Sequence, residues 1–284
     1  MSLVVTGATG SLGRLIVEAL LREGVPASEI VAGGRQLDKI ADLAERGVRV
    51  ARIDYNDAQS LADAFAGAAT LMLVSGSEVG SRIEQHSAAI AAAVTAGVQS
   101  IVYTSAPAAD SSALVLAPEH KATEELIAQS GLSFTILRNG WYTENYAAAA
   151  SQAIASGVLA SSTADGRVAS ASRADYADAA AAVLAANEHT GAVYELSGDV
   201  AWDHRELAAT LSELSGREIV FTNLSPEQHH DQLIAAGLDE GTAGFVVALD
   251  ANIRDGLLAV TTGDLSRIIG RPTTPMKETL ASLV

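Results

Sequence analysis

The sequence of 284 residues contains no cysteine, which excludes a disulfide framework and a thiolate metal site. Positive charge is scarce as well, because 18 Lys and Arg residues stand against 34 Asp and Glu residues and give a net charge of -16. Such a chain repels a phosphate backbone, so we expect no nucleic acid partner. The six His residues show no spacing typical of metal ligands, and we expect no metal site.

Long hydrophobic runs are also lacking. Although 49% of the residues are hydrophobic and the mean hydropathy is +0.23, much of this comes from alanine in helical runs such as 88–93 and 179–182. No charge-free stretch reaches the roughly 20 residues that a membrane span needs. The N-terminus shows no basic segment followed by an apolar run and a cleavage site. We therefore expect a soluble protein that resides in the cytoplasm.

Short apolar runs alternate with longer segments of helical periodicity up to about residue 140. Six strand–helix units in series predict a parallel sheet wrapped by helices, an α/β fold. Glycines of the kind expected at helix C-termini, such as Gly24 and Gly97, follow several of the helical segments. The predicted strands are 3–6, 30–33, 48–53, 70–75, 100–105 and 134–137, and the predicted helices are 11–22, 37–46, 58–65, 81–96 and 119–129.

The alternation stops near residue 140. Beyond it the pattern predicts helices at 142–155, 205–214 and 226–236, with strands at 193–196 and 218–221. We interpret residues 141–284 as a smaller C-terminal substrate subdomain that is partly interwoven with the domain formed by residues 1–140. No linker marks this boundary, and no internal repeat of solenoid length is present.

A glycine-rich turn, Thr6-Gly7-Ala8-Thr9-Gly10-Ser11-Leu12-Gly13, joins the first predicted strand to the first predicted helix. A dinucleotide-binding fold places its phosphate turn at this point. Gly7 permits the tight turn, Gly10 lets backbone N–H groups approach a pyrophosphate, and Gly13 allows close helix packing. The Gly-x-x-Gly-x-x-Gly spacing is that of the short-chain dehydrogenases. The cofactor-binding residues predicted here are Gly7, Thr9, Gly10, Ser11, Leu12 and Gly13.

The second predicted strand ends at Gly33-Gly34-Arg35, without the Asp or Glu that holds the ribose 2′-hydroxyl in NAD enzymes. Arg35 carries a fork of donors suited to a 2′-phosphate, so the sequence favours NADPH over NADH. A solvated charge at a helix start is the alternative for Arg35, and Asp38 one turn later complicates the choice. Asp54, after the third strand, is placed to meet the adenine edge, although an exposed turn residue fits as well.

The Tyr-x-x-x-Lys pair with which short-chain dehydrogenases reduce ketones is absent from the helix after the fifth strand. Ser105 stands where those enzymes carry a serine. His120 and Glu124 lie one turn apart on the next helix; His120 could donate a proton with Glu124 orienting it, or the two could form a neutral surface pair. No Gly-x-Ser-x-Gly elbow is present, so hydrolase chemistry is not supported.

Aromatic residues are few, yet Trp141, Tyr142 and Tyr146 gather directly after the sixth predicted strand. This edge of an open α/β sheet faces the cofactor crevice. Flat side chains there could hold a planar apolar substrate against the nicotinamide ring, with Asn139 and Asn145 as hydrogen-bond partners. Packing of Trp141 and Tyr142 at the subdomain junction is the alternative.

Further motifs run along the chain: Asp54-Tyr55, Ser75 to Gly80, His120-x-x-x-Glu124, Leu137 to Tyr142, Arg173 to Tyr176, Tyr194 to Gly198 and Ile269 to Thr274. Together with the glycine turn and Arg35 they resemble the NmrA-like, atypical short-chain dehydrogenases, and within these the bacterial type 2 quinone oxidoreductases. The resemblance covers essentially the whole chain.

The resemblance implies a Rossmann-like, doubly wound parallel sheet that binds NADPH and passes hydride to a quinone. It also implies site residues: Ser75, Gly76, Ser77 and Ser105 lie along the cofactor, Asn139, Gly140, Trp141 and Tyr142 form the quinone wall, and residues 170–175, with Arg173, line the pocket. Some NmrA-like proteins instead act as redox sensors that bind dinucleotide and a protein partner without turnover, and the missing Tyr-x-x-x-Lys pair keeps that alternative open. A sugar epimerase needs the Tyr and Lys that this chain lacks.

Overall fold

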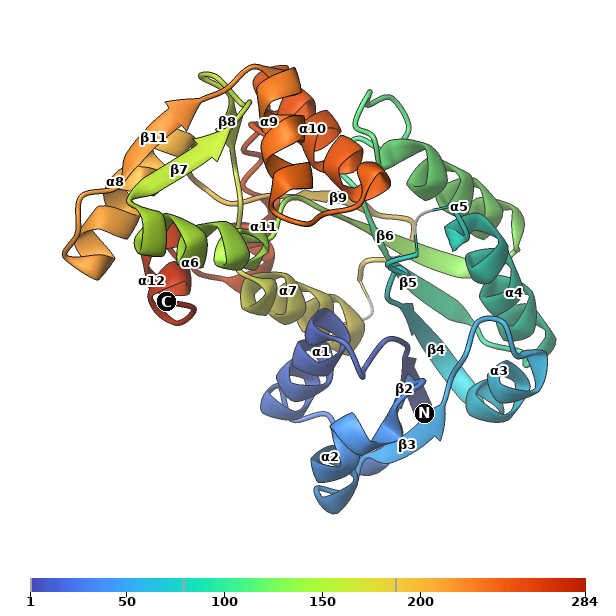
Figure 1. Cartoon of the computed structure of the whole chain (residues 1–284). Coiled ribbons are helices and arrows are strands. Elements are labelled where there is room, and N and C mark those ends of the chain that lie inside the picture. Colours follow the sequence, from blue (N-terminus) through green and yellow to red (C-terminus); the bar gives the residue numbers. More distant parts are fainter. Residues whose placement is uncertain (1, 79, 187) are drawn as a thin grey trace.

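The computed structural model describes residues 2–78, 80–186 and 188–284, so Val79 of the 75–80 motif lies outside the described residues (Figure 1). Its centre is a parallel sheet of seven strands in the order β3-β2-β1-β4-β5-β6-β9. The strand order along the chain runs outward from β1 to one edge and then from β4 to the other, so it changes direction between these two parallel strands. This order confirms the Rossmann-like, doubly wound fold. The strands are β1 (Ser2–Val5), β2 (Ile30–Gly34), β3 (Arg49–Arg52), β4 (Ala68–Leu73), β5 (Ser100–Ser105), β6 (Ser133–Asn139) and β9 (Val193–Leu196).

Helices cover both faces of this sheet. Alternate residues of β1 point to opposite faces, so that Val5 belongs to the core under α1 (Ser11–Arg22) and Val4 to the core under α3 (Ala58–Phe65). Each face therefore buries its own apolar core, as a doubly wound fold requires. Beside α3 lie α4 (Arg82–Thr95) and α5 (Ala117–Gln129), and on the side of α1 lie α7 (Arg173–Ala185) and α11 (Asp264–Ile269).

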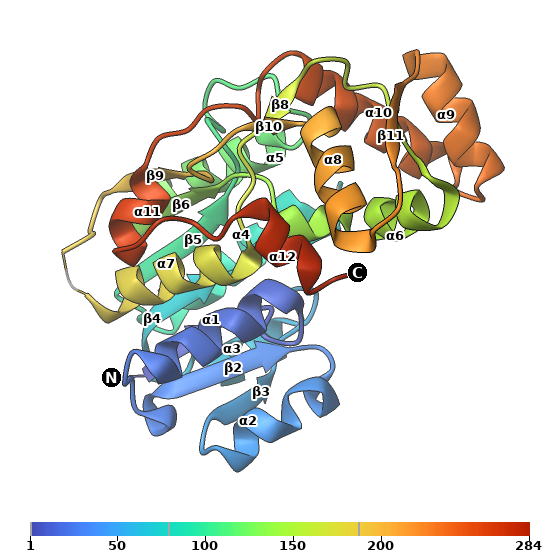
Figure 2. The same cartoon turned by 90° about the vertical axis from the view of Figure 1, so that its left-hand side faces the viewer.

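Part of the second half of the chain completes the first sheet. Strand β9 pairs with β6 in parallel, with Val193 beside Ile136. Figure 2 shows α7 alongside α1, and the α7 residues Ala177 and Ala180 are at most 1% exposed in this contact. Small side chains allow such a close approach of two helices. The boundary predicted near residue 140 thus crosses a shared core, and it stays a prediction.

The rest of the second half forms a smaller lobe above the carboxyl end of the sheet (Figure 1). Its core contains the buried residues Tyr146, Trp202 and Leu207. Strand β7 pairs with β11 in parallel and β8 with β10 antiparallel. The elements are α6 (Ala147–Ser156), β7 (Val158–Ser161), β8 (Arg167–Val168), β10 (Trp202–Asp203), α8 (His204–Ser215), β11 (Val220–Asn223), α9 (Pro226–Ala235), α10 (Glu240–Arg254) and α12 (Met276–Ala281).

Several elements differ from the sequence prediction. The predicted helix 37–46 is a 3-10 helix, η2 (Leu37–Ile40), followed by the short α2 (Ala41–Glu45), and the segment after β6 begins with the 3-10 helix η3 (Thr143–Tyr146). A further 3-10 helix, η1 (Ala27–Glu29), precedes β2. In the described ranges no helix has both the length and the apolar character needed to cross a membrane.

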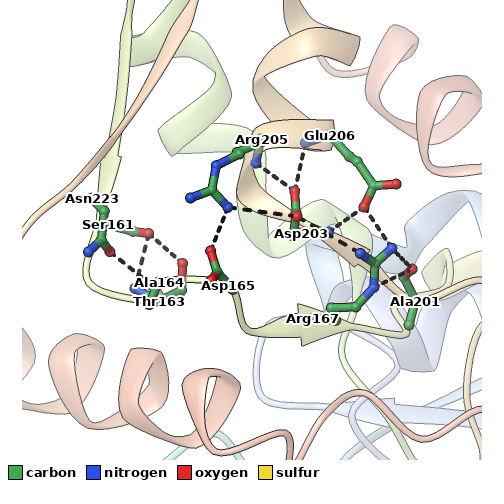
Figure 3. A network of polar contacts seen from close by, with 10 residues as sticks. All are labelled: Ser161, Thr163, Ala164, Asp165, Arg167, Ala201, Asp203, Arg205, Glu206 and Asn223. Atoms are coloured by element: carbon green, nitrogen blue, oxygen red, sulfur yellow. Dashed lines mark hydrogen bonds and ion pairs between the residues drawn. The ribbon is translucent and has the colours of Figure 1, made fainter.

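Within the smaller lobe, a network of polar contacts fixes the start of α8 to β8 and to the loop that precedes it (Figure 3). Asp203 accepts the backbone N–H groups of Arg205 and Glu206, and Glu206 in turn accepts the N–H of Asp203, which is a capping box. Arg167 donates to Glu206 at 2.7 Å, and Arg205 donates to Asp165 at 2.7 Å. The loop between β7 and β8 is therefore held against the start of α8.

Candidate functional site

A cavity of about 810 Å³ opens where β1, β2 and β4 end, at the reversal of the strand order. Ligands of doubly wound folds bind at this position. All the predicted cofactor-binding residues except Ser105 line it. The lining residues are Gly7, Thr9, Gly10, Ser11, Leu12, Gly13, Gly34, Arg35, Gln36, Lys39, Ile53, Asp54, Tyr55, Asn56, Val74, Ser75, Gly76, Ser77, Glu78, Gln85 and Arg173.

The glycine turn forms one wall of the cavity. Gly7 has a φ of 62°, which favours glycine, and its carbonyl oxygen accepts the N–H of Gly10 at 2.9 Å. A Cβ on Gly13 would lie 2.3 Å from that oxygen, so α1 can pack here only with glycine. Gly10 caps α1 without a side chain, and the first turn of the helix holds no acidic residue. The N–H groups at this helix start therefore fit a pyrophosphate.

Cations gather at the end of β2. Arg35 and Lys39 both line the cavity, whereas Asp38 is not among the residues that line it. The Arg35 guanidinium donates to Glu78 at 2.7 Å. Hydrogen bonds from Gln85 and from Arg35 lower the pKa of the Glu78 carboxyl. Because the Arg35 side chain is 61% exposed, it is free to turn towards a ligand. Two cations at the end of β2 fit a 2′-phosphate, for which Arg35 would leave its present partner Glu78.

Tyr55 is a cavity residue whose role the sequence reasoning missed. Its hydroxyl lies 2.7 Å from Thr6 Oγ1 and 3.0 Å from the carbonyl oxygen of Val74, so it joins the carboxyl ends of β1 and β4. The neighbouring Asp54 lines the cavity and pairs with Arg52 at 3.1 Å. The position of Tyr55 directly after a predicted strand was the available signal, because strand ends meet at this edge.

The structure does not bring His120 and Glu124 together. The His120 Nδ1 lies 2.7 Å from the Tyr103 hydroxyl, and the His120 side chain is buried. Glu124 instead binds Arg138 at 3.0 and 2.7 Å and accepts the Ser105 hydroxyl at 2.5 Å. The expectation that Glu124 orients His120 is therefore not met, since the charged Arg138 at the end of β6 takes both carboxylate oxygens. Ser105, His120 and Glu124 are not among the residues that line the cavity.

Two histidines are buried between α4, α5 and the sheet. Burial, together with the nearby positive charge of Arg82, lowers the pKa of His86 and of His120 from 6.5 to about 3. Both imidazoles are therefore neutral in the folded protein at neutral pH. A neutral, buried His120 is poorly suited to donate a proton to a substrate.

These two histidines make the fold sensitive to acid. Below pH 6.5 both histidines take up protons in the unfolded chain, but in the folded protein they stay neutral until about pH 3. Their contribution to the free energy of unfolding is therefore fully present above pH 6.5 and falls as the pH is lowered. We expect the free energy of unfolding to drop by about 2 kcal/mol per histidine between about pH 7.5 and about pH 5. Urea unfolding at several pH values measures this. The double variant His86→Gln/His120→Gln should show a flatter pH dependence, and an unchanged slope would contradict the assignment.

Four of the six predicted substrate residues gather beside the cofactor cavity. The Arg173 guanidinium lies 4.7 Å from the centre of the Tyr142 ring and donates to Asn145 at 2.7 Å. Asn139 donates to the Tyr142 hydroxyl at 3.3 Å. The Oδ1 atom of Asn139 is buried and accepts no hydrogen bond within the part of the chain that the structure describes. Such an unpartnered acceptor is rare among buried side-chain atoms.

The other two predicted substrate residues lie differently. Trp141 packs against the core of the smaller lobe and is only partly buried. Gly140 lines a second, mostly apolar cavity of about 240 Å³ at the ends of β6 and β9. A Cβ on Gly140 would lie 2.9 Å from the carbonyl oxygen of Leu196 and from the Tyr176 hydroxyl, which explains the glycine at this position.

Fold and cavity together define a Rossmann-like dinucleotide-binding protein. The family model of the NmrA-like family matches residues 1–253, and the chain belongs to this family.

Relatives of known activity match nearly the whole chain. Quinone oxidoreductase 2 of Escherichia coli is 45% identical over 281 residues, which cover 99% of this chain and 98% of the relative. The solved structure of the NADPH-dependent quinone oxidoreductase from E. coli complexed with NADPH has a TM-score of 0.95 to this chain, with 45% identity over 99% of both chains. The triphenylmethane reductase of Citrobacter sp. complexed with NADP(H) has a TM-score of 0.94, with 38% identity over 100% of both chains.

Proposed function

We propose that this protein is an oxidoreductase that transfers hydride from NADPH to a quinone. The observation that carries the proposal is the cavity of about 810 Å³, which joins an open helix start, two cations at the end of β2 and Arg173 at the start of α7. The E. coli relative, a quinone oxidoreductase of 45% identity, supports the same reaction. Since NADPH is regenerated in the cytoplasm, we also propose that the protein works there.

In this proposal each side of the cavity has its own task. The glycine turn holds the pyrophosphate of the cofactor, Arg35 and Lys39 hold its 2′-phosphate, and Asp54 and residues 75–77 lie along it. Asn139, Gly140, Trp141, Tyr142, Asn145 and Arg173 serve the substrate. Residues 1–140 are thus proposed as the NADP-binding domain and residues 141–284 as the substrate subdomain.

This arrangement assigns no side chain as proton donor to the substrate, which suits a quinone. Bound NADPH supplies the hydride, and the quinone must also gain a proton to become a hydroquinone. Reduction makes the ring aromatic, and the ring oxygens can take the proton from water, so positioning matters more than a strong acid. Tyr142 and Arg173 position the ring. Ser105, His120 and Glu124 take no part in the reaction in this proposal.

Loss of NADPH absorbance with a panel of soluble benzoquinones and naphthoquinones tests the proposed function. We expect oxidation of NADPH that requires both the protein and the quinone. Tight NADPH binding without oxidation by any quinone would instead favour the redox-sensor alternative. Failure to bind NADPH would contradict both functions.

A cationic triphenylmethane dye belongs in the same panel. The Citrobacter relative, 38% identical, is a triphenylmethane reductase. The delocalised carbocation of such a dye accepts hydride at carbon and needs no proton, which agrees with a cavity whose lining includes neither His120 nor Glu124. We propose these dyes as a second class of acceptor, measured by their loss of colour in the presence of NADPH.

Arg35 should decide the choice between the two nicotinamide cofactors. In the Arg35→Ala variant we expect about a tenfold loss of affinity for NADPH, the scale of one hydrogen bond to a charged group, and little change for NADH. Fluorescence titration of both cofactors measures this. Arg46→Ala, a change of another exposed arginine outside the cavity, is the matched control and should leave both affinities unchanged. Equal losses for NADPH and NADH in Arg35→Ala would contradict the 2′-phosphate assignment.

His120 should be nearly dispensable for turnover. His120→Ala is expected to lower kcat for a quinone by clearly less than the ~100-fold that follows the loss of a positioned acid. Asn139→Ala, in contrast, should lower kcat/KM for the quinone by more than His120→Ala does, because it removes the hydrogen bond that supports the Tyr142 hydroxyl. Steady-state kinetics of the two variants decide this. A collapse in His120→Ala with normal Asn139→Ala would reverse the two roles.

A further inference from the structure

The loop from Val74 to Glu78, here called the β4–α4 loop, forms the wall of the cavity opposite α1. Its first part is tied to the sheet: the N–H of Val74 donates to Thr6 Oγ1 at 2.9 Å, and the N–H of Ser75 donates to Thr104 Oγ1 at 2.8 Å. The backbone of Gly76, in contrast, makes its hydrogen bonds to side chains of α4 and not to the sheet. What holds Gly76 therefore decides where the cavity wall lies.

Two buried side chains of α4 hold Gly76 from both sides. The N–H of Gly76 donates to His86 Nε2 at 3.1 Å. The carbonyl oxygen of Gly76 accepts Arg82 Nε at 3.0 Å, and Arg82 is fixed by Glu119 at 2.7 Å. His86 is 0% exposed and Arg82 is 5% exposed. The backbone of Gly76 is thus bound to a rigid helix rather than to solvent.

The hydrogen bonds around His86 agree with only one tautomer. Since Nε2 accepts the N–H of Gly76, it carries no proton, and the proton of the neutral ring must be on Nδ1. The Nδ1 atom lies 3.0 Å from Thr123 Oγ1, which can accept because its own hydrogen goes to the carbonyl oxygen of Glu119 at 2.9 Å. Burial lowers the pKa of His86 to about 3, so the ring keeps this neutral form.

We propose that His86 is a positioning residue for NADPH, which acts through the backbone of Gly76 and fixes the β4–α4 loop in the shape that receives the cofactor. This inference rests on the proposed function, since it takes NADPH as the ligand of the cavity. The physical reason is preorganisation: a loop that is already ordered loses less conformational freedom when the ligand binds. His86 itself does not line the cavity.

Two variants separate the two nitrogens of the ring. In His86→Gln the side-chain amide oxygen reaches the position of Nε2 and can accept the N–H of Gly76. In His86→Asn the shorter amide reaches only the position of Nδ1 and keeps the contact with Thr123. We expect Kd for NADPH to rise about 3- to 10-fold in His86→Asn and to stay within about twofold in His86→Gln, on the scale of one neutral hydrogen bond. KM for the quinone should not change in either variant.

The outcomes distinguish the role of His86 from the proposed function of the protein. Equal Kd values in the two variants, with both folded by circular dichroism, would overturn the role of His86. Failure of the parent protein to bind NADPH would overturn the proposed function instead. The tautomer is tested without any variant, because nitrogen chemical shifts of the His86 ring in the intact protein report which nitrogen carries the proton. A protonated Nε2 would overturn the inference even if one variant failed to fold.

Discussion

The variant Gly10→Val is expected to keep its fold and to lose NADPH binding. Gly10 has φ −102° and ψ 171°, a conformation that valine adopts readily, and an added Cβ would lie 3.3 Å from the carbonyl oxygen of Gly7, a contact that a small shift relieves. The rest of the valine side chain would then occupy the space in front of the N–H groups that begin α1. Those groups need close approach to bind a pyrophosphate.

Circular dichroism measures whether Gly10→Val keeps its fold, and fluorescence titration with NADPH measures whether it loses binding. Gly244→Ala is the matched control, since a Cβ at Gly244 in α10 meets nothing within 4 Å, and this variant should bind NADPH normally. Gly13→Val should differ from both, because its Cβ would lie 2.3 Å from backbone and the fold itself would suffer. If Gly10→Val bound NADPH like the parent, the glycine turn would not be the phosphate site.

Loss of the Arg138 side chain is expected to cost a large part of the stability of the fold. It is 10% exposed and binds Glu124, itself 13% exposed, with two hydrogen bonds, and it also donates to Glu195 at 2.9 Å. In Arg138→Leu the buried carboxylate of Glu124 loses its positive partner. We expect the free energy of unfolding to fall by about 3 kcal/mol, the scale found when one partner of a buried ion pair is removed.

Urea unfolding measures this loss, and a double variant tests its cause. In Arg138→Leu/Glu124→Leu no uncompensated charge remains at Glu124, so the double variant should be more stable than Arg138→Leu alone. A loss below about 1 kcal/mol in Arg138→Leu, the scale of an exposed pair, would contradict the importance of this pair.

The sequence predicted the large sheet well because its signals are local. Apolar runs, helical periodicity and a glycine turn each lie within about ten residues, and together they defined six of the seven strands of the sheet. Strand β9 could be recognised as a strand, but its partner β6 lies more than fifty residues earlier, and no local pattern specifies such a pairing. For helix α7 only the alanine run 179–182 was recognised as helical, and its bounds were not predicted, because alanine on nearly every side gives no apolar stripe.

The candidate site was predictable to the extent that strand ends meet at one edge of a parallel sheet. That rule placed Arg35 and Asp54 near the glycine turn, whereas residues 75–77 were expected there only because the family resemblance implies it. The structure has all of them around one cavity. The spacing of His120 and Glu124 carried less information, because it says that two side chains share a helix face but not which neighbours compete for them. The competing groups, Tyr103 and Arg138, come from strands β5 and β6.

The return of β9 and α7 to the first sheet also affects how the chain folds while it is being synthesised. When residue 140 has just left the ribosome, β6 is still an open edge strand and α1 lacks the helix that packs on it. Unpaired edges and uncovered apolar faces are the surfaces through which nascent chains associate. We therefore expect the first half to be prone to association until residue 196 has emerged and the seventh strand can pair.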